Sequence, residues 1–298
     1  MHLGVLMFPT DYAIRPDELA RAAEERGFES LWFPEHTHIP TSRRSPWPGG
    51  PQLPQEYWHT HDLFVALATA AAVTDRLILG AGVLLLPLHE PLTLAKQLSS
   101  LDHLSGGRVI AGVGVGYVRG ESDAIGVDFA TRGRRADDCI DAMRAMWTQD
   151  QPAHDGPFFR FAGVQSYPRP VRSTGVPIHG AGMSAAGRMR AVRRCEGWYG
   201  VFMDLEATQK ALGQLRQLLG QLGRPAALGR LEVTIMPPVG PIDADTVRRY
   251  EDLGVDRLVL NHNAENASGG ASDVRRRPVL EAIERAAAVL SPWLDPTA

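Results

Sequence analysis

The chain of 298 residues has little of three features that define whole classes of protein. It contains only two cysteines, too few for the disulfide framework of a small secreted domain. No apolar run reaches the roughly 18 residues that a membrane-spanning helix needs. The formal net charge is -3, so the chain lacks the basic excess that nucleic-acid binding requires. These absences predict a protein whose partners include neither nucleic acid nor a membrane.

The N-terminus and the histidine pairs give two further expectations. Residues 1–18 carry no basic cluster before their apolar run, which fits a first strand rather than a signal peptide, so we expect a cytoplasmic protein. The pairs His36-x-His38 and His59-x-His61 have a spacing that metal ligands can use. No closely spaced set of Asp, Glu or Cys accompanies them, so we expect no metal site.

Residues 77–116 are the most informative part of the sequence. They read as an apolar run, an amphipathic helix and a second apolar run punctuated by glycine. This order describes a βαβ unit, whose two strands are parallel and buried on both faces. Pro87 and Gly116 lie where the two strands end, and parallel α/β folds place their ligands at such ends.

The alternation of strand and helix repeats about eight times along the chain. It predicts a (β/α)8 TIM barrel formed by residues 1–298 as one domain. A doubly wound open sheet has the same order of elements and stays the alternative. The expected strands are residues 2–8, 30–35, 78–86, 109–116, 177–182, 198–201, 231–236 and 257–260, and the expected helices are residues 16–26, 61–74, 91–104, 132–147, 184–194, 205–219, 243–253 and 278–290.

Two connections are longer than a compact barrel needs. Residues 37–60, after the second strand, are rich in Pro and Gly and carry Trp47, Tyr57 and Trp58. Loops of this length are usually functional or disordered, and the aromatic side chains favour a substrate lid over an ordinary surface loop. Residues 149–175, before the fifth strand, are an insertion that we expect to form a small hairpin outside the barrel.

The C-terminal ends of barrel strands face the active site and therefore select the candidate residues. Glu35 and His36 follow the second strand. A carboxylate beside an imidazole can transfer protons, because imidazole titrates near neutral pH. The alternative is an ion-pair partner next to a hydrogen-bonded loop residue, and position alone does not decide between the two.

Glycine marks three more strand ends. Inside a strand it indicates a bulge or a close approach of backbone to ligand, although tight strand packing uses it too. After the fifth strand the chain passes directly into a helix, whose free N–H groups favour phosphate binding over a plain N-cap at Ser184. The segments are Gly80-Ala81-Gly82, Gly112-x-Gly114-x-Gly116 and Gly180-Ala181-Gly182-Met183-Ser184.

Three arginines, Arg132, Arg134 and Arg135, stand at the start of the helix after the fourth strand. Positive charge there opposes the helix dipole and costs a few tenths of a kcal/mol. A bound anion would offset that cost, but we favour a solvated basic patch whose arginines pair with Asp137 and Asp138.

Four stretches together resemble the luciferase-like monooxygenase superfamily, and within it the flavin/deazaflavin oxidoreductases that use coenzyme F420. The stretches EHTHIP and LDHLSGGR are the specific part of the resemblance, which extends clearly to about Gly200. The family fold is a (β/α)8 barrel, in agreement with the strand count. The four stretches are GFESLWFPEHTHIP (27–40), LAKQLSSLDHLSGGRVIAGVGVGY (94–117), RGRRADDCIDAMRAMW (132–147) and CEGWYG (195–200).

The resemblance implies roles for particular residues. Glu35 and His36 match an acidic–His pair at which the histidine exchanges a proton with substrate. Gly82 and Val83 match a bulge, often a non-prolyl cis peptide, that supports the cofactor ring from behind. Gly114, Val115, Gly116 and Tyr117 match the segment that lines the ring, and Ala181, Gly182 and Met183 match a Gly-Gly turn that receives the cofactor phosphate.

The chain departs from the family pattern at two positions. Ala181 replaces the first glycine of the phosphate turn, so the turn is strained or rearranged if that position needs a positive φ. Tyr117 stands where relatives place a carboxylate, so it is not assigned proton donation.

Three functions remain in competition. The first is hydride transfer between F420 and a small organic substrate under the lid, with His36 moving the proton. The second is an FMN-dependent luciferase-like monooxygenase, and the third is a flavin-binding relative without catalysis. The resemblance also implies a homodimer.

Overall fold

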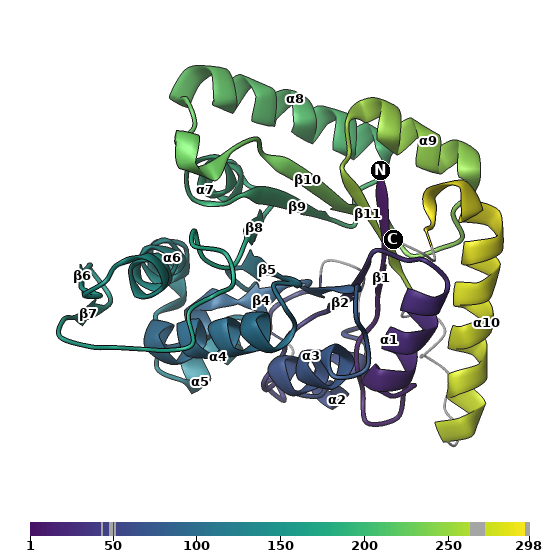
Figure 1. Ribbon diagram of the computed structural model, residues 1–298, viewed down its shortest axis with the longest axis horizontal. Coiled ribbons are helices and arrows are strands. Elements are labelled where there is room, and N and C mark those ends of the chain that lie inside the picture. The colour runs from purple at the N-terminus through teal and green to yellow at the C-terminus, as the bar shows by residue number, and fades with distance from the viewer. Residues whose placement is uncertain (43, 48–49, 51, 263–271, 296–298) are drawn as a thin grey trace.

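Eight parallel strands close into a barrel in the computed structural model, which describes residues 1–42, 44–47, 50, 52–262 and 272–295. The pairing of β3 with β5 closes the ring that otherwise runs β3-β2-β1-β11-β10-β9-β8-β5. Figure 1 labels the other strands of this ring. The predicted (β/α)8 barrel is therefore confirmed, and the open sheet is wrong. The strands are β1 (His2–Leu6), β2 (Ser30–Phe33), β3 (Ile78–Ala81), β4 (Leu84–Leu85), β5 (Val109–Gly114), β8 (Ile178–Ala181), β9 (Gly197–Val201), β10 (Glu232–Met236) and β11 (Arg257–Asn261).

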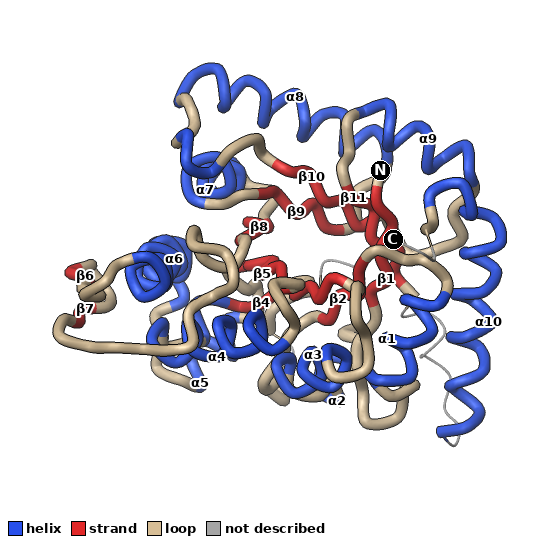
Figure 2. The backbone as a smooth tube through the Cα atoms, in the orientation of Figure 1, coloured by secondary structure: helices blue, strands red, loops and turns tan. Residues whose placement is uncertain are grey.

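Helices surround the barrel on its outside, as the blue segments of Figure 2 show. Helix α4 has the predicted bounds, because Pro91 starts it, the Glu90 side chain accepts hydrogen bonds from its first N–H groups, and Ser105-Gly106-Gly107 ends it. Among the described residues, no helix is long and apolar enough to cross a membrane. The helices are α1 (Pro16–Glu25), α2 (Glu56–His59), α3 (Leu63–Ala71), α4 (Pro91–Leu104), α5 (Arg119–Ala124), α6 (Arg132–Thr148), α7 (Ala185–Arg194), α8 (Leu205–Leu222), α9 (Ala244–Leu253) and α10 (Ser272–Leu290).

Several strands end earlier than predicted at the C-terminal end, among them the second, the third and the fourth. Strand β2 stops at Phe33, because Pro34 has no N–H to donate to the ladder. The expected third strand is divided at Gly82 and Val83 into β3 and β4, both of which pair with β5. Strand β5 stops at Gly114. The shortened ends leave their last expected residues in loops above the barrel.

The insertion of residues 149–175 forms the expected hairpin, with β6 (His154–Asp155) antiparallel to β7 (Arg160–Phe161). It lies outside the barrel, at the far left of Figure 1. Asp138 on α6 anchors it, because its Oδ2 accepts hydrogen bonds from the N–H groups of Phe158 and Phe159. The hairpin is therefore held against α6, outside the strands of the barrel.

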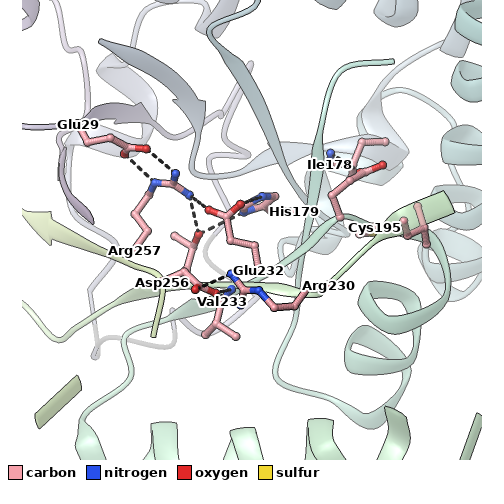
Figure 3. A network of polar contacts seen from close by, with 12 residues as sticks. Glu29, Ile178, His179, Cys195, Arg230, Glu232, Val233, Asp256 and Arg257 are labelled. Carbon is pink, nitrogen blue, oxygen red and sulfur yellow. Dashed lines mark hydrogen bonds and ion pairs between the residues drawn. The ribbon is translucent and has the colours of Figure 1, made fainter. Parts of the chain in front are cut away.

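The barrel interior is filled in its middle by Trp32 and Tyr199, whose ring centroids lie 5.2 Å apart. Gly80 on β3 faces the indole, and a Cβ placed there would overlap the ring. Below them, at the N-terminal ends of the strands, Arg257 forms ion pairs with Glu29 and Glu232 (Figure 3). Charged side chains therefore fill this end of the barrel, and a cavity lies at the other end.

Candidate active site

A cavity of about 370 Å³ lies at the C-terminal ends of the barrel strands. Its wall contains every predicted site residue except Trp58. It also contains apolar residues that the sequence did not single out, among them Leu6, Phe8 and Met236. The predicted residues in the wall are Glu35, His36, Trp47, Tyr57, Gly82, Val83, Gly114, Val115, Gly116, Tyr117, Ala181, Gly182 and Met183.

Glu35 is buried, with 3% of its surface exposed, and both carboxylate oxygens have partners. Oε2 accepts a hydrogen bond of 2.7 Å from the N–H of Leu85, and Oε1 lies 2.8 Å from Nε2 of His89. The carboxylate thus connects the end of β2 to the segment that follows β4. Both of its oxygens are used for this connection.

His36, the next residue, has a different partner. Its Nδ1 lies 2.8 Å from Oε1 of Glu121. The ring lies parallel to Phe8, with an interplanar angle of 9°, and packs against Tyr57 at a centroid distance of 4.7 Å. Nε2 has no hydrogen-bond partner among the described residues, and the side chain lines the cavity. His36 can therefore present a free ring nitrogen to a bound molecule.

Glu121, the partner of His36, is a residue that the sequence did not single out. It lies on α5 and is 2% exposed. Its backbone oxygen is 3.1 Å from Nε2 of His38, so α5 contacts both histidines of the EHTH stretch. An acidic residue five positions after Gly116, close to a strand C-terminal end, is the signal that could have identified it.

The predicted lid contributes two aromatic rings to the cavity and turns the third away. Nε1 of Trp47 donates a 2.8 Å hydrogen bond to the hydroxyl of Tyr57. Tyr57 is buried, whereas Trp58, its neighbour on α2, is 44% exposed and lies outside the cavity wall. Burial raises the pKa of Tyr57 and also that of Tyr117, so both phenols stay neutral.

The back wall of the cavity is built from closely packed backbone. The peptide bond between Gly82 and Val83 is cis. A Cβ added to Gly114 would lie 2.7 Å from a methyl carbon of Val83, and one added to Gly82 would lie 2.9 Å from a methyl carbon of Leu6. The two glycines therefore leave no room for side chains on this wall.

The turn after β8 avoids the strain that Ala181 could have caused. Ala181 is the last residue of the strand, and the positive φ of +138° falls on Gly182. Ser184 caps α7, since its hydroxyl accepts a 3.1 Å hydrogen bond from the N–H of Gly187. Nε of Arg188 is buried and has no partner among the described residues. An unpaired guanidinium N–H beside a helix N-terminus suits an anion.

The basic patch predicted at the start of α6 does not pair as expected. Arg132 and Arg135 donate to backbone oxygens, of Gly116 and Pro87 among others. Asp137 pairs instead with the buried Arg190, and Asp138 holds the hairpin. The prediction was wrong because sequence proximity on α6 says nothing of the segments packed against it. In the described ranges, no group of three or more His, Cys, Asp or Glu side chains could hold a metal ion.

Comparison with known proteins identifies the family. The model of the family described as luciferase-like monooxygenase matches residues 13–290. The chain belongs to the luciferase-like monooxygenase family. This luciferase-like protein is 34% identical over 281 residues to the uncharacterized protein Rv0953c of Mycobacterium tuberculosis (strain ATCC 25618 / H37Rv), with 93% of the chain and 97% of the relative covered.

Two further similarities concern proteins with different cofactors. The FMNH(2)-dependent dimethylsulfone monooxygenase of Pseudomonas putida is 30% identical over 161 residues, which cover 53% of this chain and 44% of that protein. A solved F420-dependent secondary alcohol dehydrogenase, in complex with an F420–acetone adduct, superposes with a TM-score of 0.77 over 99% of both chains at 16% identity. The second similarity shows that the luciferase-like barrel is shared.

Proposed function

We propose that this luciferase-like protein transfers a hydride between coenzyme F420 and a small organic substrate held under residues 37–60. The observation that carries the proposal is the position of His36, which lines an apolar cavity and whose Nε2 has no hydrogen-bond partner in the described part of the chain. When a carbon–oxygen centre gains or loses hydride, its oxygen must gain or lose a proton. A histidine beside an apolar ring site can supply or take that proton.

The residues around the cavity fit a deazaflavin or a flavin. Gly114 and Gly116 leave a flat face, and Val83 stands behind it. The turn at Gly182 and the first N–H groups of α7 would hold the phosphate. When bound, the ring supplies the carbon that accepts or donates hydride.

The other side chains orient and enclose the reactants. Glu35 fixes the segment that carries Leu85, and Tyr57 and Trp47 cover the side of the cavity next to His36. No Lys or Arg is among the described residues that line this cavity. We therefore expect an uncharged, largely apolar substrate, such as an alcohol or a ketone, whose oxygen reaches His36.

Cofactor titration tests the proposal directly. F420 fluorescence should fall as protein is added while FMN fluorescence stays unchanged, and the F420 complex should then turn over members of a panel of alcohols and ketones. Quenching of FMN alone would instead support an FMN-dependent monooxygenase, which the similarity to the dimethylsulfone monooxygenase favours. Binding without turnover of any compound would support a non-catalytic flavin-binding protein.

We also propose that the protein is a homodimer, as the family resemblance implies. Light scattering of the purified protein should give twice the mass of one chain. A mass of one chain at all protein concentrations would contradict this assembly.

A further inference from the structure

We infer that Glu121 is a positioning residue that fixes the proton-bearing nitrogen of His36. The inference rests on the proposed function for its catalytic meaning, but its structural content is independent of any cofactor. It starts from a single contact, 2.8 Å between Oε1 of Glu121 and Nδ1 of His36.

The contact determines which ring nitrogen carries hydrogen. A carboxylate can only accept hydrogen bonds, so Nδ1 of a neutral His36 must be the donor. Nε2 then has a lone pair, and it faces no partner among the described residues. Glu121 thus leaves the nitrogen at the cavity ready to accept a proton from a substrate hydroxyl. In the opposite direction, the same nitrogen donates the proton to a substrate oxygen.

The surroundings of Glu121 argue against a purely structural role. The residue is 2% exposed, and a buried carboxylate requires a hydrogen-bonded partner. The side chain that pairs with it is His36, itself 8% exposed, rather than an arginine or lysine. Two buried groups with complementary hydrogen-bonding roles therefore face each other at the cavity wall, in the arrangement by which a carboxylate orients a catalytic histidine.

The position of α5 makes the arrangement rigid. The backbone oxygen of Glu121 contacts His38, and the N–H of Arg119 donates a 3.0 Å hydrogen bond to the hydroxyl of Ser45. The loop that carries His36 is thus attached to α5 at two points, through His38 and Ser45. Glu121 can set the orientation of the His36 ring as well as its hydrogen.

The first test is made on the cofactor-free protein by NMR of ¹⁵N-labelled histidine. The His36 signals are identified by their loss in His36→Gln. We expect the wild type to show hydrogen on Nδ1 and a bare Nε2, and Glu121→Ala to shift the ring toward the Nε2–H form that free histidine favours. Asp123→Asn, which removes the charge of an exposed residue on the same helix, should leave the spectrum unchanged. If the wild-type spectrum shows the hydrogen of His36 on Nε2, the inference is wrong. This outcome does not depend on any variant.

The second test uses kinetics and keeps the shape of the side chain. Glu121→Gln should lower kcat on the order of 10²-fold while the Kd for cofactor, measured by fluorescence, stays within about twofold. Asp123→Asn should change neither. An unchanged kcat in Glu121→Gln would overturn the catalytic part of the inference. If no substrate is turned over at all, the proposed function fails, and the NMR result still decides the role of Glu121.

Discussion

Glu35 and His89 join the ends of β2 and β4 through a 2.8 Å contact between Oε1 and Nε2. The carboxylate of Glu35 therefore holds the cavity wall together, whereas His36, the next residue, binds elsewhere. The side chains of Glu35 and His36 do not bind each other, because each binds a residue from a different segment. Under the proposed function, Glu35 therefore braces the cavity wall while His36 moves the proton.

The first prediction concerns the brace. Glu35→Gln keeps the size of the side chain but removes the charge that Leu85 and His89 contact. Since hydrogen bonds to charged groups contribute about 1.5–3 kcal/mol, we expect the free energy of unfolding to fall by about this amount. Urea unfolding followed by circular dichroism measures it. Glu25→Gln, at an exposed residue of α1, is the matched control, and equal losses in both variants would show that Glu35 braces nothing.

The second prediction concerns the proton carrier. His36→Ala should lower turnover by about 10²- to 10⁴-fold, the usual contribution of general acid–base catalysis, because no other imidazole lines the cavity within the described chain. Cofactor binding should persist, since the ring site keeps Val83 and the glycines of β5. Steady-state rates and fluorescence titration separate the two effects. The exposed His61 gives the control His61→Ala. Lost binding with unchanged turnover per bound cofactor would refute the assignment.

The third prediction concerns the contact of the lid with α5. A Cβ at Gly120 would lie 2.7 Å from Cγ of Pro40, and the stiff proline ring cannot move aside cheaply. Gly120→Val should therefore weaken the docking of the loop by about 1–3 kcal/mol, as overpacking usually does. Faster proteolysis within residues 37–60 and a higher KM for the substrate would show that the loop docks more weakly. Gly213→Ala on α8, where a Cβ meets nothing within 4 Å, should leave both unchanged.

The fourth prediction concerns acid stability. Burial, together with the positive charges of Arg257 and Arg172, lowers the pKa of His179 from 6.5 to about 3. Below pH 6.5 the unfolded chain binds a proton that the folded barrel excludes. The free energy of unfolding should therefore fall as pH decreases from 6.5 toward 3, by up to about 1.4 kcal/mol per pH unit, and this residue adds no pH dependence above 6.5.

Replacing the histidine isolates its share of that pH dependence. His179→Gln should flatten the decline measured by urea unfolding at several values between about pH 7 and pH 4. His103→Gln, at an exposed position of α4, should keep the wild-type slope. If the free energy of unfolding falls equally with decreasing pH in the two variants, His179 is not the group that couples folding to pH.

Much of the barrel could be read from local signals in the sequence. Apolar runs, N-caps and terminal glycines lie within a few residues of each other along the chain, and α4 shows how they define a helix. The apolar run alone did not divide the third strand, but the resemblance implied a bulge, often with a cis peptide, at Gly82 and Val83, and the structure has the interruption and the cis bond there. Ala181 raised a question of strain that only the backbone angles of the turn could answer.

The candidate site was predictable where it lies at strand ends and unpredictable where it depends on pairing. Glu121 and His89 bind residues 85 and 54 positions away, and no spacing rule links such pairs. Trp58 does not line the cavity, and the reason is local. It follows Tyr57 on the short helix α2, and successive helical residues point about 100° apart. When Tyr57 faces the cavity, its neighbour must turn outward.

The ion pairs of Arg257 leave the described barrel with a single entrance. Trp32 and Tyr199 fill the passage above them, so neither reactant can reach the ring site from below. Under the proposed function, a heterocycle bound against Val83 would arrive before the smaller substrate that covers it and would leave after it. Under that function, binding would therefore follow a fixed order, and the heterocycle, whose redox state changes with each hydride transfer, would leave through the same entrance before the next turnover.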